Sequence, residues 1–479
     1  MEVFVIQLTV ATNWDPELIE KLAKYPVRDL YGSAPNTPIG GGRPSFLLPQ
    51  VSEEQIAEYI NEVHKHKLKF AYLLNAPCLG NMEYDRNYYR KIIEYLQWIV
   101  DIGSDYVIVT IPFLIQIIHE QFPQLKIRVS TISFVNSVNR AKFYAQLGAN
   151  EITPDVMINR DFKTLEKMQK ALKKYNCELN LLLTDGCLFQ CPFRYYHYNL
   201  TGHSSQSEHP LEGKYIDTCV LNCSIIKYSD PVELIKCRWV RPEDIVHYED
   251  IGIKYFKIAG RRMPTNWIIR SVDAYSNRKY DGNLIDIIQA ISISAEGTYK
   301  TDPFERMREC WDMEQKAKVI IDNTKLDGFI EFFKKQNCNA MCDECNYCAE
   351  WAKRAIIIDE SRTKPYVSAL KNYMLDIISG REFGLEPKGE SKKIEEKVGL
   401  KWDPRIKEIF DQIILETPDH FKEIARIAIS SMAEQKAKAR NSNIVEDIDM
   451  IEAFLEGTPG PFQNDMRNSL KKFGFNIDE

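Results

Sequence analysis

Four cysteines near residue 340 are the most closely spaced in the chain. Three residues separate Cys338 from Cys342, and two residues separate Cys342 from Cys345 and Cys345 from Cys348. A [4Fe–4S] cluster takes one thiolate for each iron, and a tight C-x2-C-x2-C loop wraps around such a cube. Structural zinc sites usually have two cysteine pairs a dozen or more residues apart. The run therefore predicts an iron–sulfur cluster, and zinc is the alternative.

A second group of cysteines is more widely spaced. Cys187 and Cys191 form one C-x3-C pair, Cys219 and Cys223 form another, and Cys237 follows. Five thiols then compete for the four positions of a second [4Fe–4S] cluster. We predict Cys187, Cys191, Cys219 and Cys223 as its ligands, with Cys237 as a substitute for one of them. The alternative is that some of these thiols pack as small hydrophobic side chains.

Three arginines and one histidine are the candidates for substrate binding and proton transfer. The loop Gly40-Gly41-Gly42-Arg43 could bind a carboxylate or phosphate through its backbone N–H groups and the guanidinium fork, and a surface loop without a ligand is the alternative. Arg261 and Arg262 follow the last predicted strand, where barrel enzymes often bind anions, although one of them could be a structural ion-pair partner. His197 could supply a proton or a ligand, or only a hydrogen bond within its loop.

The scaffold that must position these residues is predicted to be a (β/α)8 barrel. Short β-branched runs alternate eight times with longer amphipathic stretches in the first 280 residues or so. The expected strands are Val3–Val10, Arg28–Gly32, Lys69–Leu74, Tyr106–Thr110, Lys126–Ser130, Glu151–Thr153, Glu178–Leu183 and Tyr255–Ile258. The connection Asp185–Arg241 has about 55 residues, whereas such connections usually have about 2–6. We therefore predict a functional insertion at the mouth of the barrel.

The remainder of the chain has mainly helical periodicity. We predict a barrel domain with a cysteine-containing insertion over residues 1–285, and a helical region with the second cysteine cluster over residues 286–381. A Gly-, Lys- and Glu-rich linker over residues 382–398 then leads to a small helical domain over residues 399–479. Hydrophobic residues make up 44% and charged residues 27%, as in ordinary globular proteins.

Cysteine usage and charge restrict the compartment and the partners. No apolar run reaches the roughly 18–20 residues of a membrane span, and the first residues lack the features of a signal peptide, so we expect a cytoplasmic protein. Eleven of the twelve cysteines lie between Cys177 and Cys348, which without a secretory signal indicates metal binding. The net charge of −6 argues against broad attraction to nucleic acid. Lys436, Lys438 and Arg440 could form a local basic face, or only a solvated helix face.

Several motifs resemble peptidase family U32, the collagenase-like peptidases, which also include bacterial proteins of oxygen-independent hydroxylation. The motifs are DGCLFQCPFRYYH from Asp185, WVRPEDIVHYEDIGIKYFKIAGR from Trp239, and Leu30-Tyr31-Gly32 leading to the Gly40 loop. The second is the most specific, because U32 members place a short helix before a final strand that ends in K-I-x-G-R. The resemblance spans roughly residues 1–280. It implies a barrel-like fold with a four-cysteine [4Fe–4S] cluster at its mouth.

A weaker resemblance concerns the C-terminal region. Trp402–Phe454 is similar to the small C-terminal module of the light-independent protochlorophyllide reductase B subunit, in the initial tryptophan, in Thr417-Pro418 followed by Phe421, and in Arg426. This resemblance implies redox work near another iron–sulfur centre. A helical packing module is the alternative.

The functional prediction is an iron–sulfur redox enzyme of the U32 type. Motifs of metalloproteases and serine hydrolases, HExxH and GxSxG, are missing from the sequence. We therefore expect an oxygen-independent hydroxylation or a related modification under anaerobic conditions, with a redox donor or another protein as partner. The substrate, small or macromolecular, is left open. The alternatives are a U32 peptidase and a non-catalytic iron–sulfur subunit that pairs with a catalytic partner.

Overall fold

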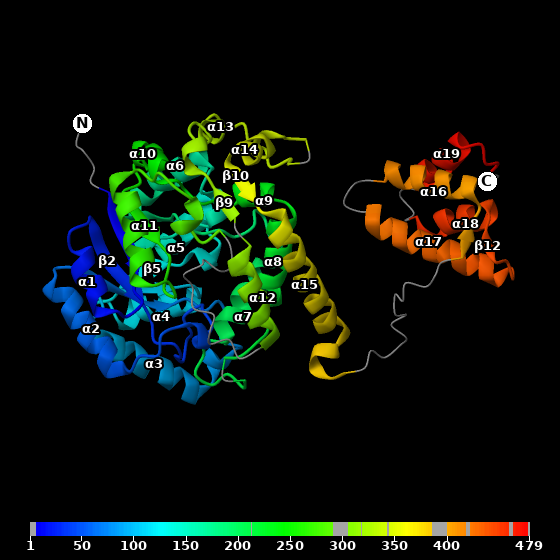
Figure 1. Cartoon of the computed structure of the whole chain (residues 1–479). Coiled ribbons are helices and arrows are strands. Elements are labelled where there is room, and N and C mark those ends of the chain that lie inside the picture. The colour runs from blue at the N-terminus through cyan, green and yellow to red at the C-terminus, as the bar shows by residue number, and fades with distance from the viewer. Residues whose placement is uncertain are drawn as a thin grey trace. The chain divides into compact units, whose positions relative to one another are not determined.

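Eight parallel strands follow one another in sequence order and close into a barrel (Figure 1). β1 pairs with β8 and so closes it. The computed structural model describes residues 6–211, 213–290, 305–317, 319–342, 344–385, 400–417, 422–458 and 463–477. The barrel strands are β1 (Gln7–Ala11), β2 (Val27–Gly32), β3 (Lys69–Leu74), β4 (Tyr106–Val109), β5 (Lys126–Val129), β6 (Glu151–Ile152), β7 (Glu178–Leu182) and β8 (Tyr255–Ile258). Each lies where the sequence predicts it, so the (β/α)8 prediction is confirmed. Residues 1–5 of the first predicted strand lie outside the described residues.

Helices alternate with these strands and cover the outside of the barrel. They are α1 (Pro16–Leu22), α2 (Glu53–Lys65), α3 (Arg86–Asp101), α4 (Pro112–Gln121), α5 (Val138–Gln146), α6 (Phe162–Leu172), α10 (Ile245–Asp250) and α11 (Thr265–Asn277). Short polar side chains accept hydrogen bonds from the first turn of several helices, as Asp85 does in α3 and Asp161 in α6. Such N-caps satisfy free backbone N–H groups and determine where a helix starts.

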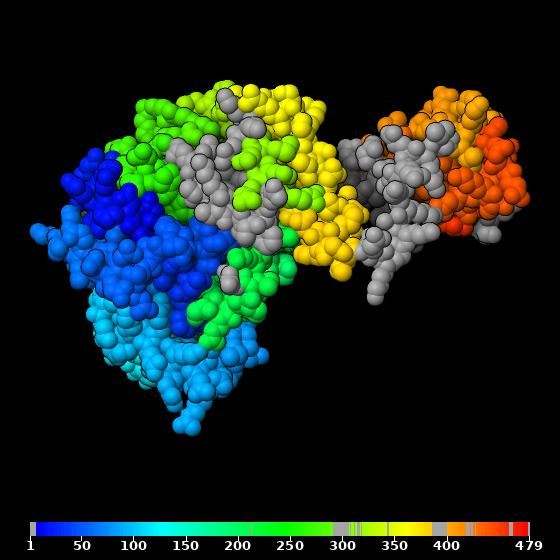
Figure 2. Space-filling view, turned by 60° about the horizontal axis from the view of Figure 1, so that its bottom comes forward, coloured from blue at the N-terminus to red at the C-terminus, as the bar shows by residue number. Residues whose placement is uncertain are grey.

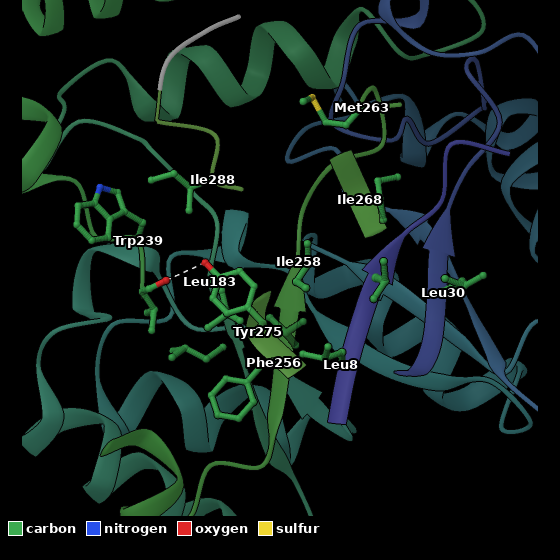
Figure 3. Close-up of a cluster of buried hydrophobic side chains, with 14 of the residues drawn as sticks. Leu8, Leu30, Leu183, Trp239, Phe256, Ile258, Met263, Ile268, Tyr275 and Ile288 are labelled. Carbon is green, nitrogen blue, oxygen red and sulfur yellow. Dashed lines mark hydrogen bonds between the residues drawn. The ribbon is translucent and has the colours of Figure 1, made fainter. Parts of the chain in front are cut away.

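Alternation along β8 separates the outer core from the barrel interior. Phe256 and Ile258 pack with Leu8 of β1 and Ile268 of α11 in the layer between barrel and helices (Figure 3). Because successive side chains of a strand point to opposite faces, Lys257 points into the barrel. Side chains that point into the barrel therefore have different neighbours from those that pack in the hydrophobic layer between the barrel and the helices.

A network of four charged residues fills the barrel toward the amino ends of the strands. Arg128 donates hydrogen bonds to both carboxylate oxygens of Asp29, at 2.8 and 2.7 Å, and its Nε lies 3.1 Å from Glu151. Arg28 binds the same two carboxylates at 2.7 and 2.9 Å. Two cations and two anions balance, which buried charges require. The network forms a neutral floor under the mouth of the barrel.

The insertion after β7 is helical rather than a loop. Between Asp185 and Arg241 it forms α7 (Arg194–His203), α8 (Thr218–Ser229) and α9 (Val232–Lys236). Ser205 accepts a hydrogen bond from Gly41 N at 2.9 Å, which joins the insertion to the loop after β2. In Figure 2 the green insertion lies between the blue N-terminal units and the yellow helix α15 (Glu360–Ser379), against which α8 packs. The insertion therefore covers the side of the barrel on which the strands end.

The residues that follow the barrel add helices and a small sheet. Their elements are α12 (Glu305–Lys316), β9 (Val319–Ile321), α13 (Glu331–Lys334), α14 (Tyr347–Ala355), β10 (Ile356–Ile358) and α15. β9 and β10 pair antiparallel. Arg241, at the end of the insertion, is buried and donates hydrogen bonds to Asn323 and to the carbonyl of Leu326, both at 2.7 Å. This region is thereby fixed to the barrel.

The chain divides into two compact units, Met1–Leu385 and Glu386–Glu479. The second unit contains β11 (Lys401–Trp402), α16 (Pro404–Glu416), α17 (Lys422–Ala439), β12 (Ile444–Val445), α18 (Asp447–Gly457) and α19 (Gln463–Lys472) around its own hydrophobic core. Most of the predicted linker 382–398 lies outside the described residues.

Two of the three residues of the predicted basic face, Lys436 and Arg440, are paired with acidic residues. Lys436 forms ion pairs with Glu452 and Glu456, at 3.0 and 2.6 Å, and Arg440 pairs with Asp449 at 2.6 Å. These pairs neutralise much of the local basic face considered above. In the described part of the chain, no helix is long and apolar enough to cross a membrane.

Candidate functional site

A cavity of about 220 Å³ lies at the carboxyl ends of the barrel strands. Its walls come from the loops after β2, β7 and β8 and from helices α7 and α8 of the insertion. Eight residues predicted from the sequence line it: Arg43, Cys187, Cys191, His197, Cys219, Cys223, Arg261 and Arg262. The fold thus brings together residues that are more than 200 positions apart in the sequence. The four cysteines from Cys338 to Cys348 lie elsewhere.

The cavity cysteines, Cys187, Cys191, Cys219 and Cys223, are here called the mouth cysteines. The first two precede α7, and Cys187 N donates a hydrogen bond to the Asp185 carboxylate at 2.6 Å. Cys219 and Cys223 lie four residues apart on α8 and so share one face of that helix. Burial raises the pKa of Cys219 to about 12. The Cys219 thiol would therefore be deprotonated only when a metal binds, and its proton would be released to solvent.

Cys237, the fifth cysteine of this group, does not line the cavity. It is fully buried, and its Sγ donates hydrogen bonds to the carbonyls of Gly186 and Glu233, each at 3.2 Å. Burial raises the pKa of Cys237 to about 11. Its thiol interacts electrostatically with Cys223 and Lys227, so Cys237 is a neighbour of the mouth cysteines although it does not line the cavity.

Lys227 is a buried cation next to the mouth cysteines that the sequence analysis missed. Its ammonium donates hydrogen bonds to the carbonyls of Gly186 and Ala290 at 2.5 and 2.7 Å, and among the described residues it has no carboxylate partner. Burial would lower the pKa of Lys227, but the neighbouring sulfurs of Cys223, Cys237 and Cys187 outweigh burial and raise it. The sequence indicates this position, because Lys227 follows Cys223 by four residues and residues four apart share one face of a helix.

His197 belongs to a hydrogen-bonded group that supports α8. Its Nε2 lies 3.0 Å from Asp217 Oδ2, and the Tyr215 hydroxyl donates to the same oxygen at 3.2 Å. The other Asp217 oxygen accepts from Val220 N at 2.9 Å and so caps α8. Burial would raise the pKa of Asp217, but His197 and these hydrogen bonds lower it. The geometry gives His197 a part in positioning the helix that carries Cys219 and Cys223.

The glycine loop and Arg261 form a cationic wall of the cavity. Gly40 N and Gly41 N already donate to Thr37 and Ser205, at 2.7 and 2.9 Å, so anion binding by this loop would depend on Arg43. Arg261 donates to Ser33 Oγ at 3.1 Å and to the Gly41 carbonyl at 2.5 Å. Burial and the nearby Arg43 lower the pKa of Arg261 to about 10. Arg43 makes no hydrogen bond or ion pair with a described residue.

Lys257 is a second cavity residue that the sequence analysis missed. It is 8% exposed, and its ammonium nitrogen lies 4.0 Å from the centre of the Tyr31 ring. Among the described residues it has no carboxylate partner within ion-pair distance. Burial, followed by the charges of Arg128 and Arg261, lowers the pKa of Lys257 to about 7. A lysine near the carboxyl end of an otherwise apolar barrel strand was the signal in the sequence.

The charge of the cavity wall is strongly positive. Six arginines and lysines line it against two aspartates: Arg43, Arg194, Lys227, Lys257, Arg261 and Arg262 against Asp185 and Asp217. Of these cations, Arg194 is paired with Asp155 at 2.8 Å. Such a wall attracts anions, whether a carboxylate or phosphate substrate or the thiolates of a metal cluster.

The second set, Cys338, Cys342, Cys345 and Cys348, is here called the loop cysteines. They lie in the segment before α14 and at its start, and Cys338 is exposed. Arg238 Nη2 donates to Cys338 Sγ at 3.8 Å. Burial raises the pKa of Cys348, whereas Arg160 and Arg238 act in the opposite direction. The loop cysteines are therefore also accompanied by buried cations.

The donor sets can be compared with what each metal requires. Within the ranges that the structure describes, no three His, Cys, Asp or Glu side chains are grouped so as to hold a single metal ion. A [4Fe–4S] cube is larger than one ion and takes one thiolate at each iron, so its ligands stand farther apart than those of one zinc. Each set offers four thiols beside cations that lack carboxylate partners among the described residues. Both sets fit the needs of such a cluster.

Comparison with known proteins identifies the family. The model of peptidase family U32 matches residues 48–281. The uncharacterized protease MJ1657 of Methanocaldococcus jannaschii is 31% identical over 323 residues, which cover 66% of this chain and 86% of that protein. Among solved structures, the U32 peptidase Mk0906 is 18% identical with a TM-score of 0.40, over 53% of this chain and 93% of that one. Citrate synthase SbnG is 10% identical with a TM-score of 0.30, over 56% and 91%. The chain belongs to peptidase family U32.

Proposed function

We propose that this protein is an iron–sulfur redox enzyme that modifies an anionic organic substrate without using molecular oxygen. The observation that supports this most is the presence, beside both cysteine sets, of buried cations that have no carboxylate partner among the described residues. Lys227 lies beside the mouth cysteines, and Arg160 and Arg238 lie beside the loop cysteines. A buried charge is costly unless it is paired, and thiolates that hold a metal cluster would supply the missing negative charge.

The mouth cysteines are proposed to hold the cluster at which the substrate reacts. When bound, such a cluster supplies one-electron redox chemistry. Lys227 would compensate the charge of the thiolates, while Asp217 would keep α8 in place through its cap. Arg43 and Arg261 would bind a carboxylate or phosphate of the substrate on the opposite wall. The cover formed by α7 and α8 would limit the access of water.

The loop cysteines are proposed to hold an accessory cluster that passes electrons to the mouth. The segment 236–238 lies between the two sets. Arg238 stacks on Phe189 in the mouth loop, 3.7 Å from the ring centre, and also donates to Cys338 Sγ. Its neighbour Cys237 bonds to the carbonyl of Gly186 in that same loop. Because Cys338 is exposed, a redox donor protein could reach this end of the path.

The second candidate function is a peptidase, which the names of the relatives favour. The relative MJ1657 is named an uncharacterized protease, and the family itself is named a peptidase family. A nucleophilic peptidase needs a hydroxyl or thiol within hydrogen-bond reach of its base. His197, the histidine of the cavity, has Asp217 as its hydrogen-bond partner among the described residues. The geometry therefore gives less support to this candidate.

Anaerobic purification followed by iron, sulfide and zinc analysis tests the proposal. We expect about eight iron and about eight sulfide per chain, since each cluster holds four of each. Stoichiometric zinc without sulfide would overturn it. Anaerobic incubation with denatured collagen or casein tests the peptidase, and cleavage that is lost in Cys187→Ala would favour that candidate instead.

A further inference from the structure

We propose that the amine of Lys257 is a nucleophile that forms an imine with a 2-oxo acid bound in the mouth cavity. The inference deepens the proposed function, because it rests on this cavity being the substrate site. It assigns a covalent role to a residue that is not one of the cysteine ligands.

The position of Lys257 is the first argument. Strand β8 places Phe256 and Ile258 in the outer core, as Figure 3 shows, and so directs Lys257 inward to the cavity wall. Barrel enzymes carry their reactive groups near the carboxyl ends of the strands, and Lys257 is the third of the four residues of β8. The amine therefore lies where a bound substrate would contact it.

The charge state of Lys257 is the second argument. Both carboxylates of the barrel floor, Asp29 and Glu151, are shared by Arg28 and Arg128, so a protonated Lys257 would be an excess charge. The Tyr31 ring attracts an ammonium, but burial and two guanidinium groups act against it. With a pKa of about 7, a large fraction of the amine is unprotonated near neutral pH. Only the unprotonated amine can attack a carbonyl.

The surrounding cations select the class of substrate. Arg261 is fixed by Ser33 and Gly41, acts electrostatically on Lys257, and lies near Arg43. A guanidinium fork matches the geometry of a carboxylate. A molecule held here by its carboxylate, and attacked by the adjacent amine, needs a carbonyl next to that carboxylate. A 2-oxo acid has this arrangement.

The reaction is a condensation that consumes no oxidant or reductant. The Lys257 nitrogen forms a bond to the carbonyl carbon as the C=O π bond breaks, and the carbonyl oxygen takes one of the two amine protons to give a carbinolamine. The hydroxyl then leaves with the remaining N–H proton as water, and the C=N double bond forms. A protonated imine would be stabilised by the carboxylate of the same substrate.

Reductive trapping tests the proposal. The purified, cluster-loaded protein is incubated anaerobically with pyruvate or 2-oxoglutarate, treated with sodium borohydride, digested and analysed by mass spectrometry. We expect the reduced adduct on the peptide that contains Lys257. The wild-type peptide identifies the modified lysine, so this result does not depend on whether a variant folds.

Variants sharpen the assignment. Lys257→Arg keeps a cation but should abolish trapping, whereas Lys254→Arg should leave it unchanged, because Lys254 is paired with Glu178 at 2.8 Å. Arg261→Lys should lower trapping about tenfold at subsaturating pyruvate, since it removes a fork for the carboxylate. No adduct on Lys257 with either acid at saturation, or equal labelling of surface lysines, would overturn the proposal. Iron and sulfide analysis of the same preparation reports separately on the proposed function.

Discussion

The mouth cysteines lie on α8 and the loop before α7, inside a cavity that also holds Arg43, Arg261 and Lys257, whereas the loop cysteines lie along an irregular segment that reaches the surface at Cys338. Their spacing in the sequence made the loop cysteines the stronger candidates for cluster ligands. Their surroundings make the mouth cysteines the stronger candidates for chemistry. Ligand spacing indicates what can be bound, while the environment of the ligands indicates how the bound group is used.

The cations of the two regions extend this comparison. Lys227 beside the mouth cysteines is held by two backbone carbonyls and is buried. Arg238 contacts the sulfur of Cys338, one of the loop cysteines, and the ring of Phe189, which lies in the loop of Cys187 and Cys191. The first cation is suited to stabilise a fixed charge, and the second lies between the two sets. Four experiments test the difference.

Removing one cysteine from each set should give the largest effects. We expect Cys223→Ser and Cys345→Ser each to lower the iron content from about eight to about four per chain. Both should lose one of two cluster signals in electron paramagnetic resonance, but not the same one. Cys78→Ser, outside both sets, is the matched control and should keep all the iron. Identical losses of signal in both cysteine variants would contradict the assignment of two clusters.

Removing the N-cap of α8 should affect only the mouth. Asp217 and Asp161 each cap a helix by accepting from the backbone N–H three residues later, at 2.9 and 3.0 Å. Asp161→Ala should cost about 1 kcal/mol of stability. Asp217→Ala should cost about 2–4 kcal/mol, because His197 and Tyr215 also lose their partner.

Anaerobic melting curves with iron analysis measure both effects. The Asp217→Ala variant should lose iron from the mouth and keep it at the loop cysteines. Equal melting temperatures for Asp217→Ala and Asp161→Ala, with full iron in both, would show that Asp217 has no special role.

The pH dependence of the free energy of unfolding should reveal the protonation of Lys257, the lysine inside the cavity. In the folded chain, burial and the charges of Arg128 and Arg261 outweigh the carboxylates of Asp29 and Glu151, and the pKa of Lys257 falls from 10.5 to about 7. Between these values the unfolded chain binds more protons, so Lys257 makes stability rise with pH. From pH 7.5 to 9 the gain should be about 2 kcal/mol, at 1.36 kcal/mol per unit.

Lys257→Met should remove this part of the slope. Denaturant unfolding of the wild type and the variant at several pH values gives the difference between them, in which the contributions of other groups cancel. A wild-type slope no steeper than that of the variant would show that the amine remains charged in the folded protein.

The smallest effect is expected for the cation between the two sets. Arg238→Met removes a positive charge near Cys338, which should lower the reduction potential of the loop cluster by about 50–100 mV. Arg354→Met is the matched control, because Arg354 lies on α14 but is exposed to solvent. Redox titration followed by electron paramagnetic resonance measures both. A shift of the same size in the two variants would argue against a specific role for Arg238.

Much of the fold could be predicted because its signals are local. Many strands are short apolar runs, of which Tyr106–Val109 is rich in β-branched residues, and the helices have a repeating apolar face, so neighbouring residues specify the element. The helical nature of the insertion was missed, because its cysteines, tyrosines and glycines obscure the apolar period of α7 and α8. The candidate site was predicted in part, since Arg261 and the cysteine pairs follow predicted strands.

The sequence by itself determined the order of eight β/α units, the two groups of cysteines and the arginines after β2 and β8. Only the tertiary structure decided which thiols face the cavity, and which cations lack a partner. The reason is that ion pairs form between residues that are distant in the sequence. Arg128, for example, pairs with Asp29, which lies 99 residues away. That pairing leaves Lys257 without a carboxylate of its own within ion-pair distance in the described part of the chain. No pattern in the neighbourhood of Lys257 could have predicted this result.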